Sequence, residues 1–187
     1  MPSYGPPWKM AIIGAVAVVA GCALLMRDWP LAELTLFVAM VFVARGALHL
    51  VTMTFEGVSG ALAALRGYSE LGIGVMLLVW PHPTLLVLGV VVGAFVVVRS
   101  TVAATVDLAT RRDLPYWQFG FASDAIEIAL GVAIIARPGD SVHTTTITLA
   151  ILAIFTGAVE IAWAAAQKRA ETRRQKTMKV RAVAATA

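Results

Sequence analysis

Seven ionisable side chains lie inside long apolar stretches of the sequence. They are Arg45, His49, Glu70, Arg99, Asp124, Glu127 and Glu160. A charge at the centre of a membrane-spanning helix costs roughly 2.5–3.5 kcal/mol on insertion scales, so such residues usually face the protein interior and pair with one another. The chemistry open to this set is therefore ion pairing, or the binding and release of protons.

The elements that must hold these residues are membrane-spanning helices. The chain is 59% hydrophobic and only 14% charged, which is far from the composition of a soluble domain. A bilayer core requires about 20 apolar residues per helix. Six runs of that size recur, at 10–26, 31–53, 61–80, 84–106, 117–136 and 141–166. We therefore expect an all-α integral membrane protein, with six transmembrane helices in one domain over residues 1–170.

Basic residues divide the connections between these helices into two groups. One side holds Lys9, Arg66, Arg111, Arg112 and the seven Lys and Arg residues between 168 and 181. The turns on the other side carry only Arg27 and Arg137. Because cytoplasmic loops are enriched in Lys and Arg, both termini are predicted in the cytoplasm. The basic segment 171–187 is expected to be a disordered tail that contacts anionic lipid, rather than a nucleic-acid-binding surface.

Three helical hairpins, at 8–56, 61–112 and 116–170, share a pattern of prolines and small residues, which predicts an internal repeat around a shared interior with pseudo-threefold symmetry. Alignment on Pro30, Pro81 and Pro138 makes Glu70 equivalent to Glu127, with Val19 in the first hairpin. In the second helices it aligns Arg45-Gly46, Arg99-Ser100 and Thr156-Gly157. Gly89 and Gly93 form a GxxxG motif, which permits close helix packing within the chain or in a homo-oligomer.

This triplicated pattern resembles the HdeD-type acid-resistance membrane proteins, a short-repeat family. The first hairpin carries it with Gly14, Gly21 and Pro30, the second with LRGYSELGIGVMLLVWPHPT at 65–84, and the third with Trp117, Gly131, Pro138 and Gly157. The resemblance implies a six-helix protein of the bacterial inner membrane that is associated with survival in acid. It brings no catalytic motif to this chain. Arg45 and Arg99 depart from the pattern that we expect of the family.

Two interpretations of the buried charges stay open. In the structural one, the arginines form permanent ion pairs with Glu70, Asp124, Glu127 or Glu160, and these pairs determine which helices pack together. In the functional one, four carboxylates outnumber two arginines, so at least one acid is free to bind a proton. Glu127 is favoured for that role because Asp124 lies one turn away, whereas Arg66 is placed to neutralise Glu70 within the same helix.

The remaining polar residues indicate no catalytic chemistry. His82 and His143 are predicted in the outer turns, where an exposed histidine changes charge near about pH 6.5 and can sense acid, or is simply a polar turn residue. The sequence contains no HExxH, CxxC, phosphate-binding loop or Ser-His-Asp set. We therefore expect no metal, no cofactor and no enzymatic activity. The sequence favours a protein that supports tolerance of acid or envelope stress, with a structural, assembly or lipid-binding protein as the alternative.

Overall fold

The computed structural model describes residues 7–52, 57–80, 84–109, 111, 117–136 and 141–186, with the side chains of 7, 52, 57–63, 171, 173, 174, 176, 177 and 179–186 left out of the description. Its elements are α1 (Pro7–Leu25), α2 (Leu31–Thr52), α3 (Gly57–Val79), α4 (Leu85–Ala109), α5 (Trp117–Ala136) and α6 (Val142–Thr186). Within the described residues, five of these helices are long and apolar enough to cross a membrane, namely α1, α2, α4, α5 and α6. This confirms an all-helical chain with the character of a multi-pass membrane protein.

Local capping explains where several helices begin. The hydroxyl oxygen of Thr84 accepts a hydrogen bond from the backbone amide of Val87 at 3.3 Å, at the start of α4. The hydroxyl oxygen of Ser141 accepts one from the amide of Thr144 at 3.1 Å, at the start of α6. Side-chain oxygens at these positions satisfy amides that have no partner in the first turn of a helix. Pro81, His82 and Pro138 lie outside the described residues.

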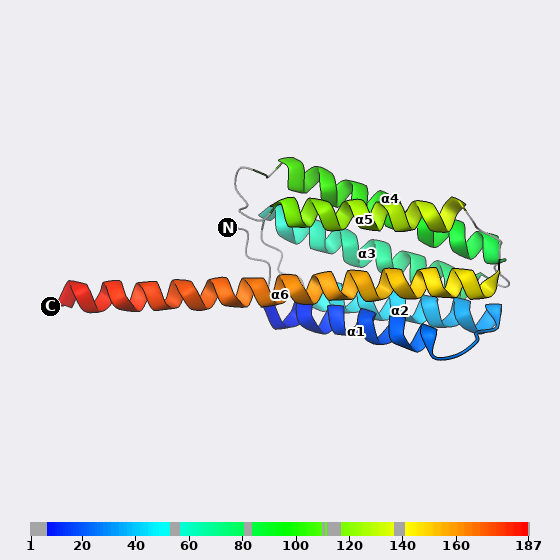
Figure 1. Cartoon of the computed structure of the whole chain (residues 1–187), viewed down its shortest axis with the longest axis horizontal. Helices are drawn as coiled ribbons and strands as arrows, with labels where there is room; N and C mark the ends of the chain where they lie inside the picture. The colour runs from blue at the N-terminus through cyan, green and yellow to red at the C-terminus, as the bar shows by residue number, and fades with distance from the viewer. Residues whose placement is uncertain are drawn as a thin grey trace.

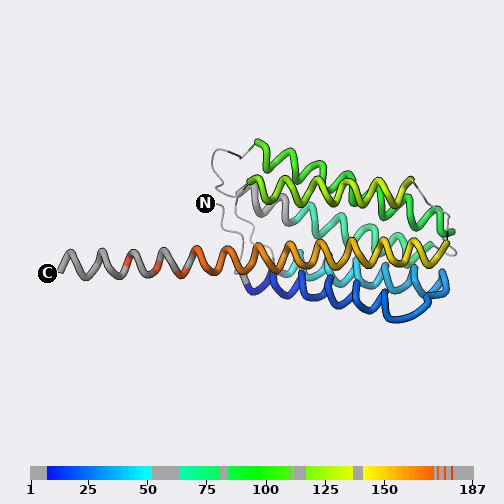
Figure 2. Tube along the Cα trace, viewed as in Figure 1, coloured from blue at the N-terminus to red at the C-terminus, as the bar shows by residue number. Residues whose placement is uncertain are grey.

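The six helices pack as three close pairs, α1 with α6, α2 with α3, and α4 with α5. Figure 1 shows the bundle, and Figure 2 shows α1 in blue beside α6 in yellow to orange. Contacts between α1 and α2, α3 and α4, or α5 and α6 are much sparser. The closest packing therefore joins helices from different predicted hairpins, rather than the two helices of one hairpin.

Glycines lie where the paired helices touch. A Cβ atom on Gly14 would lie 2.6 Å from a backbone carbonyl oxygen of α6, and one on Gly46 would lie 2.8 Å from a carbonyl oxygen of α3. A Cβ atom on Gly93 would lie 2.9 Å from a carbonyl oxygen of α5. Small residues let membrane helices approach closely, so a larger side chain at any of these sites would push the pair apart. Gly89, the other glycine of the GxxxG motif, is also buried.

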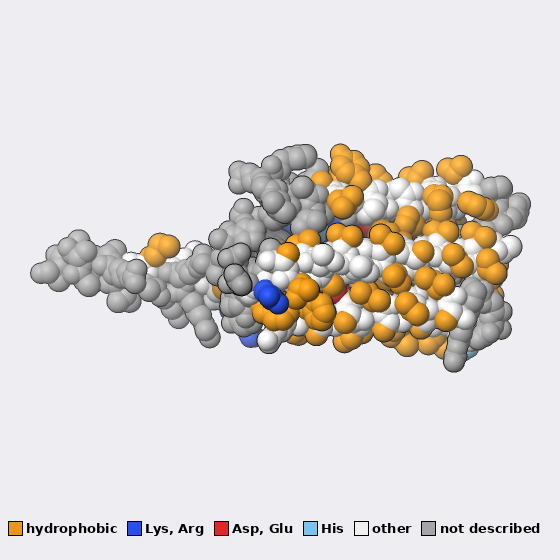
Figure 3. Space-filling view, turned by 90° about the horizontal axis from the view of Figure 1, so that it is seen from above, with side chains coloured by type: hydrophobic (Ala, Val, Ile, Leu, Met, Phe, Trp, Pro, Cys, Tyr) orange, Lys and Arg blue, Asp and Glu red, His pale blue; other side chains and the backbone are white. Residues whose placement is uncertain are grey.

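The outer surface of the bundle and the length of its last helix both suit a membrane protein. Figure 3 shows apolar side chains spread over the side of the bundle, with Lys and Arg at the end from which α6 projects. Helix α6 has 45 residues, which is about 68 Å at a rise of 1.5 Å per residue. That is more than twice the roughly 30 Å of a bilayer core. The segment that we expected to be a disordered tail continues α6 as helix to Thr186.

Candidate functional site, a buried charge network

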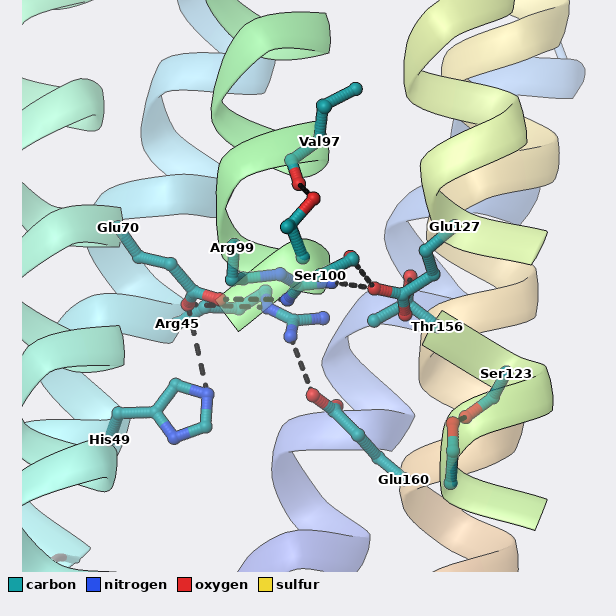
Figure 4. A network of polar contacts seen from close by, with 12 residues as sticks. Arg45, His49, Glu70, Val97, Arg99, Ser100, Ser123, Glu127, Thr156 and Glu160 are labelled. Carbon is teal, nitrogen blue, oxygen red and sulfur yellow. Dashed lines mark hydrogen bonds and ion pairs between the residues drawn. The ribbon is translucent and has the colours of Figure 1, made fainter. Parts of the chain in front are cut away.

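Five charged side chains meet inside the bundle, one from each of the helices α2 to α6. Along the network their signs alternate, in the order Glu160, Arg45, Glu70, Arg99 and Glu127. Figure 4 shows the two arginines between Glu70 on one side and the other two glutamates. With His49, which lies beside Glu70, the structure thus brings together six of the seven residues that the sequence singled out.

Each arginine joins two carboxylates from other helices. Nη2 of Arg45 donates a hydrogen bond to Oε1 of Glu160 at 2.7 Å, and its Nε lies 3.5 Å from Oε2 of Glu70. Nη1 of Arg99 lies 3.6 Å from Oε1 of Glu70, and its Nη2 donates to Oε2 of Glu127. Glu70, which is 1% exposed, therefore bridges both guanidinium groups.

Glu127 has the largest set of hydrogen-bond donors in the network. Besides Arg99, the hydroxyl of Ser100 donates to its Oε2 at 2.7 Å, and the hydroxyl of Thr156 donates to its Oε1 at 3.1 Å. Hydrogen bonds to a carboxylate stabilise its ionised form. The expectation that Glu127 is the acid short of a partner is therefore wrong, because both of its oxygens are satisfied. The sequence alignment did place Thr156 at the position of the arginines and Ser100 next to it, but gave no reason to assign them a role.

Two pairings that the sequence left open are not formed among the described side chains. Asp124 is half-buried on α5 and forms no ion pair with either arginine within the described part of the chain. The ion pairs of Glu70 run to α2 and α4, and among the described side chains none runs to Arg66. Glu70 points into the bundle, where two guanidinium groups from other helices reach it, so a pair within its own helix is not needed.

The network carries more negative than positive charge. Three carboxylates face two guanidinium groups, and His49 adds a nearby imidazole whose Nε2 lies 3.8 Å from Oε2 of Glu70. With His49 neutral, the excess is one negative charge. The positive charge of Arg66 on α3 also acts on Glu127 and His49, so this excess is that of the five network side chains alone.

Some polar atoms of the network lack hydrogen bonds. In the described part of the chain, Oε2 of Glu70, Oε2 of Glu160 and Nε of Arg99 are buried without a hydrogen-bond partner. Oε2 of Glu70 is nevertheless ion-paired, since it lies 3.5 Å from Nε of Arg45 and 3.8 Å from Nε2 of His49.

The network also connects the three close helix pairs. The contact between Arg45 and Glu160 joins the α2/α3 pair to the α1/α6 pair, and that between Arg99 and Glu70 joins α4/α5 to α2/α3. The hydrogen bond between Thr156 and Glu127 joins α1/α6 to α4/α5. Each junction between pairs is therefore spanned by a polar contact of the network, where direct helix packing is sparse.

The remaining candidate residues lie away from this centre. Nδ1 of His143, at the start of α6, lies 3.7 Å from Oδ1 of Asp28, and both side chains are exposed. His82 falls outside the described residues. The part of the chain that the structure describes contains no group of three or more His, Cys, Asp or Glu side chains that is arranged to hold a metal ion.

Comparison with known proteins identifies the family. The family model described as a short repeat of unknown function (DUF308) matches the chain twice, at residues 65–135 and 125–185. This chain belongs to that short-repeat family. The family is the one that contains the HdeD-type membrane proteins, so the resemblance seen in the sequence is confirmed at the level of the family. No curated protein and no solved structure is detectably similar to the chain.

Proposed function

We propose that this short-repeat protein is a non-enzymatic membrane protein that supports tolerance of acid or envelope stress by exchanging protons on its buried carboxylates. The observation that carries the proposal is the charge count of the network, in which three carboxylates face two guanidinium groups. A proton taken up from acid removes the excess charge. Membership of the family that contains the HdeD-type proteins supports the link to acid.

Glu160 is the carboxylate best suited to carry that proton. It has a single guanidinium partner, Arg45, and its Oε2 accepts no hydrogen bond within the described residues. Glu127 has three donors on its two oxygens, and Glu70 contacts both arginines. The charged form of Glu160 therefore has the fewest stabilising contacts of the three buried glutamates.

Proton uptake would also act on the packing of the bundle. The ion pair between Glu160 and Arg45 spans the junction between the α1/α6 and α2/α3 pairs. Neutralising Glu160 weakens the attraction across this junction, while the glycine-mediated contacts inside each pair are unaffected. A local change of charge is thereby converted into a change in how rigid helix pairs are held together.

The spacing of the close helix contacts supports the proposed internal repeat. Gly14 and Gly21 on α1 touch α6, and Gly67 and Gly74 on α3 touch α2, with seven residues between the two glycines in both helices. This register puts Ala17, rather than Val19, at the position of Glu70. Ala17 is 1% exposed and Val19 is 67% exposed, which explains why α1 contributes no charge to the network.

The placement in the membrane follows from the basic residues. Helix α1 begins at the end of the bundle from which α6 projects, so both lie on the side richest in Lys and Arg (Figure 1). We place this end in the cytoplasm of a bacterial cell, in line with the positive-inside rule. We further propose that the basic extension of α6 contacts anionic lipid headgroups and that the protein forms a homo-oligomer.

Proton flux into liposomes tests the function directly. The purified wild type is compared with Glu160→Gln under an imposed pH gradient, and Glu33→Gln serves as control because Glu33 is 53% exposed and outside the network. Flux in the wild type and the control that is lost in a folded Glu160→Gln supports the proposal. Equal flux in all three, or none in the wild type, rejects it.

A structural role is the alternative, and one observation favours it. Every charge of the network has at least one partner of opposite sign, and the contacts join all three helix pairs. If the ion pairs are permanent packing devices, Glu160→Gln lowers the thermal stability without any proton flux in the wild type. The same liposomes then serve to measure lipid binding by the basic end of the protein.

A further inference from the structure

The two ends of the bundle differ in the side chains that a proton meets on its way to the charge network. Towards the end opposite the projecting part of α6, the helices α2, α4 and α6 are packed by apolar core residues, namely Leu34, Val38, Leu88, Val92, Leu149 and Leu152. Towards the basic end, from which α6 projects, lie the ionisable side chains of Arg66, Asp107 and Asp124. Water that carries a proton needs polar partners, so the basic end offers the easier approach.

Asp107 lies at the edge of the membrane-spanning part of α4. The distance along α4 from its first residue, Leu85, to Asp107 is about 33 Å at a rise of 1.5 Å per residue, and a bilayer core is roughly 30 Å thick. The carboxylate of Asp107 occupies the space that a Cβ atom on Gly120 of α5 would fill. The absence of a side chain at Gly120, which is buried, thus lets an acid at the membrane edge contact the helix that carries Glu127.

Asp124 lies on the same line of contact between α4 and α5, between Asp107 and the network. The contact of Asp107 with α5 has the same register as the hydrogen bond from Ser100 to Glu127. This register puts Asp124 opposite Ala103, which offers a carboxylate neither a hydrogen-bond donor nor a cation. Along α5, Asp124 is about 6 Å from the level of Asp107 and about 4.5 Å from Glu127. The three carboxylates therefore follow one another at intervals of about one helical turn.

A single guanidinium group attracts all three of these carboxylates. The charge of Arg66 on α3 acts on Asp107, on Asp124 and on Glu127. The other charges that act on Asp124 are those of Glu127, Asp107 and Arg99. An ionisable side chain inside a membrane helix is costly, and within the described residues no ion pair accounts for Asp124. A series of acidic side chains is the arrangement that membrane proteins use to relay protons.

Two other approaches from the basic end are less suited to a proton. His49 lies beside the network, but three arginines, Arg66 among them, oppose a positive charge on its ring. Below Glu160, the contact between α1 and α6 is closed by Ile13 and Ala164, which are both buried and apolar. The contact between α4 and α5 is therefore the approach on which a proton meets acidic groups at every turn.

We propose that Asp107 and Asp124 relay protons from the basic end to Glu127, along the contact between α4 and α5. Thr156 continues the path, because its hydroxyl donates to Glu127 at 3.1 Å and lies one turn from Glu160 on α6. The inference rests on the proposed function. It adds to that function the end from which protons enter and two residues that make no ion pair with the network.

The rate at which the buried carboxyl group becomes protonated after a drop in pH tests this route. The full chain in nanodiscs is mixed with acid and followed by time-resolved infrared absorption, and the band of protonated Glu160 is the one that Glu160→Gln lacks. In Asp124→Asn this band should rise at least about tenfold more slowly than in the wild type, to the same final height. Asp124→Glu should keep the rate, because it keeps a carboxyl group. Asp28→Asn is the matched control, because Asp28 is fully exposed at the opposite end.

Chemical rescue separates the loss of a relay from a loss of structure. Azide, whose conjugate acid is a small weak acid, carries protons past a missing carboxyl group, so it should restore the rate in Asp124→Asn. Asp107→Asn, at the membrane edge, should slow the band in the same way. An equal rate in Asp124→Asn and Asp28→Asn, or a slow rate that azide does not restore, overturns the route and leaves the proposed function standing. If no such band rises in the wild type, the network does not exchange protons, and both fail.

Discussion

Removing the guanidinium of Arg45 is the most direct perturbation of the network. Arg45→Met keeps an unbranched side chain of similar length but withdraws the shared partner of Glu160 and Glu70, at 2.7 and 3.5 Å. The excess negative charge of the buried cluster then rises from one to two. Breaking a buried ion pair from one side costs about 3–5 kcal/mol. For a chain of this size, 1 kcal/mol corresponds to about 2–4 °C, so the melting temperature should fall by roughly 6–20 °C.

The assay is thermal unfolding in one detergent at neutral pH, followed by tryptophan fluorescence. Arg27→Met is the control, because Arg27 pairs with Glu33 where both side chains are 53% exposed. Exposed pairs contribute about 0–1 kcal/mol, so this control should melt within about 4 °C of the wild type. The double variant Arg45→Met/Glu160→Gln returns the excess to one charge and should recover part of the loss.

Two further results are expected for Arg45→Met. Its deficit should shrink in acid, because a carboxylate left without its partner is neutral once protonated. Its far-ultraviolet circular dichroism should remain helical, because the glycine contacts within each helix pair are untouched. The network does not hold the helix pairs together if Arg45→Met and Arg27→Met have the same melting temperature. The same conclusion follows if Arg45→Met/Glu160→Gln is less stable than Arg45→Met.

Three further predictions concern the helix pairs, the hydrogen bonds of Glu127 and the outer turns. Gly14→Leu should lower the melting temperature strongly, because an added Cβ meets the α6 backbone at 2.6 Å, whereas Gly72→Leu should be tolerated, since nothing lies within 4 Å of a Cβ there. Thr156→Val should cost about 1–3 kcal/mol in the free energy of unfolding, because it removes a buried donor from Glu127. Measurement of the melting temperature checks both. His143→Ala should melt at the same temperature as the wild type at both neutral and mildly acidic pH, because the His143 side chain is 72% exposed and its partner Asp28 is fully exposed. A difference of several degrees in acid would show that this pair contributes to stability there.

The sequence was sufficient to predict which residues lie inside the bundle. Hydropathy predicted six apolar helices, five of which are long and apolar enough to cross a membrane in the described residues. The cost of burying charge indicated that Arg45, Arg99, Glu70, Glu127 and Glu160 face inwards. All five are in the network. These are properties of single residues in an apolar run, and the physical rule that governs them does not depend on which helices are neighbours.

The sequence was not sufficient to predict the partners. Which helices pair depends on how closely two backbones approach, and this is set by glycines such as Gly14 and Gly157 that lie far apart in the chain. The alignment on prolines made Val19 the equivalent of Glu70 in the first hairpin. A turn of different length shifts this register without changing the apolar pattern. The preference for Glu127 failed for a related reason, since hydroxyl donors from α4 and α6 are not visible from α5 alone.

The proposed repeat identifies the origin of the excess charge. Arg45, Arg99 and Thr156 occupy one equivalent position, and Ala17, Glu70 and Glu127 occupy another, so two arginines balance two glutamates. The additional acid is Glu160, whose counterparts are His49 in the first hairpin and Ala103 in the second. Glu160→Gln therefore removes the unbalanced charge and only one ion pair.

Of the three buried glutamates, Glu160 should therefore be the one whose replacement by glutamine is best tolerated. Glu70→Gln weakens contacts to both arginines, and Glu127→Gln replaces an oxygen that accepts hydrogen bonds with an amide donor. Glu160→Gln should have the highest melting temperature of the three variants, Glu127→Gln the next and Glu70→Gln the lowest. If Glu160→Gln is as unstable as Glu70→Gln, the charge of Glu160 is not the unbalanced one and the excess is compensated elsewhere.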